Sequence, residues 1–129
     1  MILLAISFFL SIFNIYISKY LFELDRCVIN RGIAFGVSME LIVFISIILL
    51  LVLIILGYIN KGRIRYILFC IFLFGLSNLI VRLLLGGICD YISIPFLFFN
   101  IADLGIVLLS FYAGVCIIGI NWEKNNREV

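Results

Sequence analysis

Long apolar runs separated by short polar breaks divide the chain into four segments. The apolar runs extend over about residues 1–20, 37–58, 64–85 and 95–119. Each is close to the roughly 20 residues that an α-helix needs to cross the hydrocarbon core of a bilayer. The pattern predicts an all-α integral membrane protein, with four transmembrane helices and short outer loops in a single membrane domain over residues 1–129.

The first apolar run carries a regular polar stripe. Its members, at steps of four, three and four residues, are Ser7, Ser11, Asn14 and Ser18. This spacing places them on one face of a helix. Small and polar residues allow transmembrane helices to approach closely, so we expect this face to pack against the other helices. The run lacks a basic start and a small-residue cleavage site, which argues against a removable signal peptide.

The composition supports a membrane protein and narrows its chemistry. Hydrophobic residues make up 67% of the chain and charged residues 12%, against about 25% charged in soluble domains. The net charge of +2 is too small and too scattered to indicate nucleic-acid binding. The chain has no histidine, which excludes histidine bases and most zinc sites. Any catalysis must use carboxylates, thiols or hydroxyls, and no metal or organic cofactor is indicated.

Basic residues in the short connections predict the orientation. Lys61, Arg63 and Arg65 crowd the connection between the second and third runs, and the positive-inside rule places that connection in the cytoplasm. With four spans both termini are then cytoplasmic, which agrees with Lys124 and Arg127 in the tail. Three basic residues beside the first outer loop weaken this assignment: Lys19, Arg26 and Arg31.

The stretch from Asn78 to Asp103 holds polar side chains that an apolar chain seldom carries. They are Asn78, Arg82, Asp90, Asn100 and Asp103. A charge at the centre of a bilayer-spanning helix costs about 2.5–3.5 kcal/mol, so such residues indicate a functional site by default. In the predicted topology, Asp90 lies on the outer loop and the other four lie in the adjoining ends of the third and fourth spans. We therefore expect one polar site just below the outer surface.

Asp90 and Asp103 can meet if the third and fourth spans are antiparallel neighbours. Two carboxylates at hydrogen-bonding distance share one proton near neutral pH. The ionised member can activate a water while the protonated member polarises a carbonyl, which is aspartic-type peptide hydrolysis. Arg82 would steady the site by charge-assisted hydrogen bonds, for example to the backbone of the Asp90 loop. The alternative is an Arg82–Asp103 ion pair that merely joins two helices.

A second motif lies in the first outer loop, over residues 30–36. Gly32 and Gly36 permit backbone turns, and Asn30 offers both a donor and an acceptor that could reach the same site. The alternative is a glycine-punctuated entry into the second span.

These motifs together resemble the lipoprotein signal peptidase family, signal peptidase II, which removes the signal peptides of bacterial prolipoproteins. The family's Asn-x-Gly-x-Ala-Phe motif is matched at Asn30, Gly32, Ala34 and Phe35, and its Gly-Asn-x-x-Asp-Arg motif is matched in part at Asn78 and Arg82. Its Gly-x-x-x-Asp-(Phe/Tyr) segment is matched at Gly86 and Asp90–Tyr91, and its Phe-Asn-x-Ala-Asp segment at Phe99–Asp103. The four motifs follow in order over nearly the whole chain.

The resemblance implies roles for individual residues. Asp90 and Asp103 would be the catalytic dyad. The residues that would line and orient the site are Asn30, Gly32, Asn78, Arg82 and Asn100. The implied substrate is a membrane-anchored prolipoprotein, cut just before its lipid-modified cysteine near the outer face of the bacterial cytoplasmic membrane. We expect a monomer in the lipid bilayer that binds no nucleic acid and needs no cofactor.

The chain also departs from the family's pattern. Ile15 and Tyr16 replace the acid and amide of the family's motif at the end of span one, of which Ser18–Lys19 remains. Ser77 and Val81 replace a glycine and an aspartate before Arg82, and the first outer loop is shorter than the family's.

Three other hypotheses therefore stay open. Cys27 and Cys89 would both lie outside, where a disulfide can form and where a thiol redox enzyme could work. A small proton-coupled transporter or channel subunit could use the same carboxylates. A catalytically inactive relative could bind lipoprotein precursors without cutting them.

Overall fold

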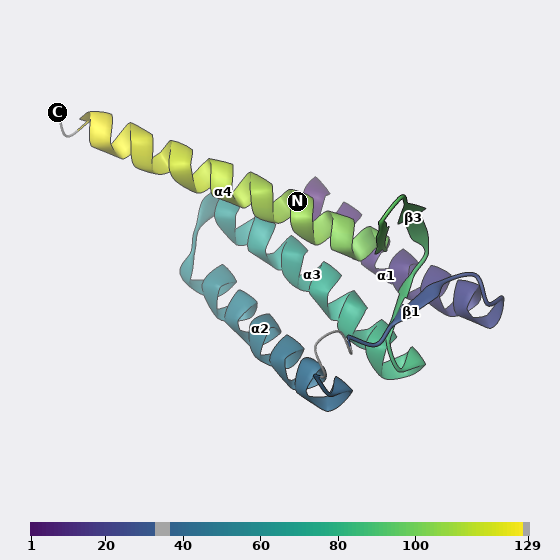
Figure 1. Cartoon of the computed structure of the whole chain (residues 1–129). Helices are drawn as coiled ribbons and strands as arrows, with labels where there is room; N and C mark the ends of the chain where they lie inside the picture. Colours follow the sequence, from purple (N-terminus) through teal and green to yellow (C-terminus); the bar gives the residue numbers. More distant parts are fainter. Residues whose placement is uncertain (33–36, 128–129) are drawn as a thin grey trace.

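Four long helices dominate the computed structural model, which describes residues 1–32 and 37–127 (Figure 1). They are α1 (Ile2–Glu23), α2 (Met39–Ile59), α3 (Gly62–Leu85) and α4 (Ile101–Arg127). Each is long and apolar enough to cross a membrane. The prediction of a mostly helical protein with four helices able to span a membrane is therefore confirmed.

The connections at one end contain four short strands, which the all-α prediction missed. They are β1 (Val28–Asn30), β2 (Ile88–Asp90), β3 (Ile92–Ile94) and β4 (Leu97–Phe99). β1 pairs with β2 and β3 pairs with β4, both antiparallel, in two separate sheets. Isoleucine, valine and phenylalanine favour strands, but three-residue strands are too short to show an alternating pattern in the sequence.

Helix α3 is the central element and packs against each of the other three helices (Figure 1). It lies between α2 and α4, and about half of the residues in its most apolar stretch are buried. The polar stripe of α1 is buried as predicted, and Asn14 of the stripe contacts Ser77 and Asn78 of α3. Small side chains on this interface leave room for the α3 backbone.

The fourth apolar run does not begin its helix at Pro95, as the sequence pattern suggested. Pro95 and Phe96 form the two-residue turn between β3 and β4, and Phe96 has a φ of 73°. Proline followed by a residue with positive φ is the pattern of a type II turn. The helix begins at Ile101 and continues beyond Gly119 to Arg127, where Arg127 pairs with Glu123 at 3.6 Å.

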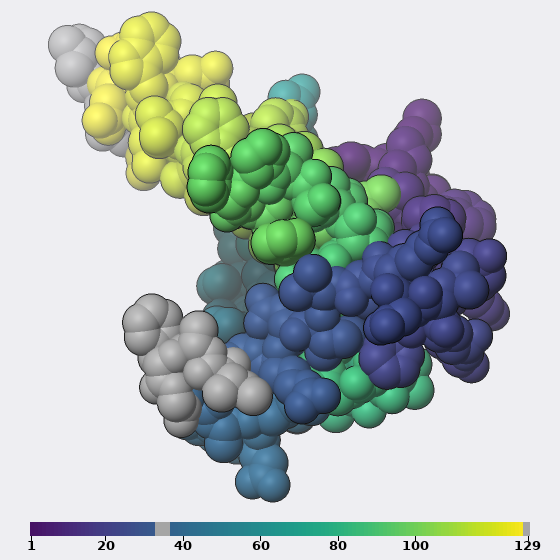
Figure 2. Space-filling model, turned by 45° about the vertical axis from the view of Figure 1, so that its right-hand side comes forward, coloured from purple at the N-terminus to yellow at the C-terminus, as the bar shows by residue number. Residues whose placement is uncertain are grey.

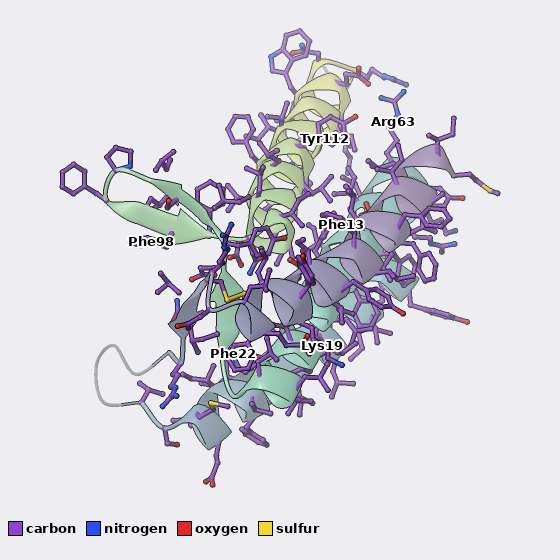
Figure 3. The ribbon with its side chains drawn as sticks, turned by 90° about the vertical axis from the view of Figure 1, so that its right-hand side faces the viewer. Phe13, Lys19, Phe22, Arg63, Phe98 and Tyr112 are labelled. Atoms are coloured by element: carbon purple, nitrogen blue, oxygen red, sulfur yellow. A yellow bond between two sulfur atoms is a disulfide. The ribbon has the colours of Figure 1, made fainter. Side chains whose placement is uncertain are left out.

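The strands lie at one end of the helices, beside the end of α3 and the start of α4 (Figure 3). Arg63, near the start of α3, lies far from Phe22 at the end of α1 and from Phe98 on β4. The connection after α1 therefore meets the connection between α3 and α4, and these two connections carry the candidate site.

Gly105 allows α4 to approach α3 closely enough to build that site. A Cβ atom at this position would lie 2.5 Å from Cε2 of the buried Phe74 ring. We expect Gly105→Ala to destabilise the protein by about 1–3 kcal/mol, because overpacking displaces the ring or the helix. The unfolding midpoint in detergent measures this effect. Gly114→Ala is the matched control, because no heavy atom lies within 4 Å of its Cβ position. Equal midpoints for the two variants would contradict the prediction.

Candidate active site

The five polar residues between Asn78 and Asp103 come from three neighbouring elements. Asn78 and Arg82 lie in the last two turns of α3, and Asp90 ends β2. Asn100 and Asp103 lie at the start of α4. The glycine at position 86, with a φ of 72°, ends α3 in the left-handed conformation and turns the chain into β2. The structure thus brings all five residues to the same end of the helices.

The Asp103 carboxylate is held by two donors. Nδ2 of Asn78 donates to its Oδ1 at 2.8 Å, and the backbone N–H of Asn100 donates to its Oδ2 at 3.2 Å. In return, the Asp103 backbone N–H donates to Oδ1 of Asn100 at 3.0 Å. Asn100 and Asp103 therefore cap the helix reciprocally. The sequence pattern had placed Asn100 inside the fourth helix, whereas it lies just before the helix begins. The positive end of the α4 dipole also favours a negative charge here.

Asp90 is buried at the end of β2, opposite Val28 of β1. Its Oδ1 atom accepts no hydrogen bond from the described residues. Burial first, and then the charge of Asp103, raise the pKa of Asp90 to about 6. The amides of Asn30 and Asn100 and the charge of Arg82 act in the opposite direction. The two aspartates are thus coupled electrostatically and have different surroundings.

Arg82 is buried beside both carboxylates without forming an ion pair. Among residues 1–32 and 37–127 the one ion pair is Glu123–Arg127. Within the same residues, Nε of Arg82 has no hydrogen-bond partner. The hypothesis of an Arg82–Asp103 pair that joins two helices is therefore wrong for this structure. The expected bonds from Arg82 to the Asp90 loop are not seen in the described part either. Arg82 acts on Asp90 through its charge.

Asn30 approaches the site from β1. Its Oδ1 accepts the backbone N–H of Gly32 at 2.9 Å, which leaves the amide nitrogen to favour the ionised form of Asp90. Gly32 has a φ of 69°, a conformation that favours glycine. Residues 33–36 of this motif, among them Ala34, Phe35 and Gly36, fall outside the described residues.

Two of the cavities beside these polar residues border Asn30 and Arg82, respectively. One of about 510 Å³ is bounded by β1, Asp90 and the β3–β4 turn, and Asn30 and Phe96 line it. The other, of about 250 Å³, lies among α2, α3 and α4, and its lining includes Asn78 and Arg82. Figure 2 shows the surface hollowed between α4 and the blue segment near the start of α2. Asp90 itself lines the larger of these two cavities.

A family model described as signal peptidase (SPase) II matches residues 2–121. The chain belongs to the signal peptidase II family. No curated protein and no solved structure matches the chain. The resemblance drawn from the motifs is confirmed, and the chain is an aspartic-type signal peptidase. Membership implies cleavage of prolipoprotein signal peptides by a multi-pass protein, consistent with the bacterial cytoplasmic membrane.

Two residues that sequence reasoning did not assign to the site connect to it in this signal peptidase. Asn14 of α1 donates to Ser77 and Asn78, and Tyr91 donates to Asn14. The signal for Asn14 was its place in the polar stripe of the first span. Tyr16, at the position of the family's amide, is 73% exposed.

The disulfide left open by the sequence is formed between Cys27 and Cys89. It ties the segment after α1 to β2, one residue before Asp90. Cys70 and Cys116 are free, so the described chain has one bridge that joins loops. A structural role explains this bridge without any redox activity, because it fastens the strand that carries Asp90.

Loss of this disulfide should weaken the fold measurably. The bridge spans 62 residues, and disulfides contribute about 2–4 kcal/mol, more for longer loops. We expect Cys27→Ser to lower the unfolding midpoint, and reductant to lower the wild-type midpoint to the same value. Cys116→Ser is the control and should keep the wild-type response to reductant. An unchanged wild-type midpoint after complete reduction would contradict the prediction.

Proposed function

We propose that this signal peptidase cuts prolipoproteins just before their lipid-modified cysteine, with Asp90 and Asp103 as the catalytic dyad. The observation that carries the proposal is the pair of carboxylates from β2 and α4, whose surroundings differ. Asp103 accepts two hydrogen bonds, whereas Asp90 is buried with a raised pKa of about 6. Environments that separate two titratable groups in this way are typical of acid and base partners.

The geometry supports a division of roles. Two donors hold the Asp103 carboxylate in a fixed orientation, and in the proposal Asp103 is the base that activates water. Burial and the neighbouring charge favour the protonated form of Asp90, so Asp90 donates a hydrogen bond to the scissile carbonyl. The pair works with one shared proton in addition to the protons of the water.

The reaction then proceeds in two balanced steps. Asp103 takes a proton from water as the water oxygen bonds to the carbonyl carbon, and Asp90 gives its proton to the carbonyl oxygen. The neutral tetrahedral diol collapses when Asp103 returns its proton to the leaving nitrogen and Asp90 recovers one from a diol hydroxyl. The C–N bond breaks, and the products are the signal-peptide carboxylic acid and the amino group of the lipidated cysteine.

The remaining site residues support this chemistry in the proposal. Arg82 stabilises the single negative charge of the pair, and Asn78 and Asn100 hold Asp103. Asn30, fixed by the turn at Gly32, borders the cavity beside Asp90 where the substrate backbone would lie. The active enzyme is a monomer with both termini in the cytoplasm, and the site lies at the outer face.

The proposal is tested with purified protein in lipid nanodiscs and a synthetic prolipoprotein peptide carrying a diacylglyceryl cysteine. Mass spectrometry should show one new pair of products, separated before that cysteine. The same peptide without lipid is the matched control and should be cut far more slowly. An Asp90→Asn/Asp103→Asn protein provides the blank. A cut elsewhere, equal cutting of both peptides, or no cutting by a folded protein would overturn the proposal.

A further inference from the structure

Asn14 is a fully buried residue on α1, and both its amide nitrogen and its amide oxygen form hydrogen bonds. Its Nδ2 donates to Oγ of Ser77 at 3.2 Å and to Oδ1 of Asn78 at 3.4 Å. Its Oδ1 accepts the hydroxyl of Tyr91 at 2.9 Å. Because these groups lie in an apolar environment, a lost bond would leave a buried polar atom unsatisfied.

The contacts of Asn14 determine which way the Asn78 amide points. Oδ1 of Asn78 faces the donor from Asn14, so Nδ2 of Asn78 faces Oδ1 of Asp103, at 2.8 Å. A rotated Asn78 amide would place two donors together on one side and two acceptors together on the other. The Asn14 side chain therefore keeps a donor aimed at the Asp103 carboxylate.

Tyr91 completes the chain from the start of α4. Its hydroxyl accepts the backbone N–H of Ile101 at 3.2 Å and donates to Asn14. The bonds run from Ile101 to Tyr91, Asn14, Asn78 and Asp103, and each donor points toward the next member. Such aligned bonds polarise one another, and here they end at a carboxylate. The chain joins three elements, α1, α3 and α4, to one oxygen atom of Asp103.

We propose that Asn14 and Tyr91 are positioning residues of the peptidase, which act through Asn78 to fix the Asp103 carboxylate against the attacking water. This inference rests on the proposed function of the dyad. The Asn14 side chain is fully buried and acts through its hydrogen bonds. The effect of Asn14 and Tyr91 is on the orientation of Asp103, so the rate of the chemical step depends on them and substrate binding does not.

The experiment compares Asn14→Leu, Tyr91→Phe and the double variant with wild type in nanodiscs. Asn14→Leu should lower kcat about tenfold and change KM less than about twofold, because a misplacement of 1 Å costs up to about 100-fold. Tyr91→Phe should lower kcat less. The double variant should be no slower than Asn14→Leu, because both residues act through one chain. Losses that multiply, or a rise in KM alone, would overturn the inference.

Ser11→Ala is the matched control on the same face of α1. Ser11 is equally part of the buried stripe, and its hydroxyl has no hydrogen-bond partner among the described residues. Its removal should leave kcat, KM and the unfolding midpoint near wild type. A loss in Ser11→Ala equal to that in Asn14→Leu would show that helix packing, and not positioning, sets the rate.

A second readout separates this inference from the proposed function. The infrared carboxylate stretch of Asp103 is assigned as the band that Asp103→Asn removes. Asn14→Leu should shift this band, and Ser11→Ala should leave it in place. If Asn14→Leu shifts the band while the wild type cuts no prolipoprotein, the positioning role stands and the peptidase dyad is rejected. An unshifted band in an active protein would reject the positioning role alone.

Discussion

Asp103→Asn is expected to lower kcat for prolipoprotein cleavage by about 10³-fold, and Asp90→Asn by a similar factor. General acid and base groups each contribute about 10²- to 10⁴-fold, and neither asparagine can take up or release the required proton. The amide is nearly isosteric with the carboxylate, so the fold around it should persist. The rate of product formation by mass spectrometry, at saturating substrate, measures the loss.

The losses in kcat caused by the two substitutions should not multiply in the double variant. Residues that act as a unit show strongly non-additive losses, so the double variant should be about as slow as the slower single variant. Asp25→Asn is the matched control, because Asp25 is exposed in the segment between α1 and β1. It should cleave at the wild-type rate. Wild-type activity in either dyad variant would remove that aspartate from the mechanism.

The four membrane-spanning helices could be predicted from the sequence because their signal is strong and local. Each run of about 20 apolar residues leaves the backbone few alternatives in a bilayer. The predicted ends of the helices were less accurate where a few polar or aromatic residues determine where a helix begins. Helix α4 begins at Ile101 because Asn100 and Asp103 cap it, while Pro95 and Phe96 form a turn.

The candidate site was partly predictable for a similar reason. Charged and amide residues are rare in this chain, so Arg82, Asp90 and Asp103 stand out from their apolar neighbours. Their contacts could not be predicted, because they depend on the angle and separation of helices that the sequence does not encode locally. Arg82 forms no ion pair with Asp103, and Asn78 holds that carboxylate instead.

Asn14 shows what a pattern can and cannot reveal. Its place in the buried stripe of α1 predicted contact with another helix, and α3 provides that contact. The connection to Asp103 requires Tyr91 and Asn78 at the same height, from segments more than 60 residues away in sequence. This meeting of distant segments in space is visible only in the structure.

The raised pKa of Asp90, about 6, gives the cleavage reaction a defined pH dependence. In the proposed mechanism the active form carries a proton on Asp90 and none on Asp103. As pH rises through about 6, Asp90 loses its proton, so kcat/KM should fall and approach a tenfold loss per pH unit. Protonation of the pair at lower pH should produce a second, acidic limb, because the two carboxylates titrate together.

Asn30 offers a direct test of this assignment. Its amide favours the ionised form of Asp90, so Asn30→Leu should move the falling limb to higher pH. Rates measured from pH 5 to 8 at low substrate give kcat/KM, and circular dichroism checks that the helices persist. Asn121→Leu, on the exposed end of α4, is the control and should keep the wild-type profile. Activity that rises from pH 6 to 8 would instead assign the ionised role to Asp90, because deprotonation would then create the active form.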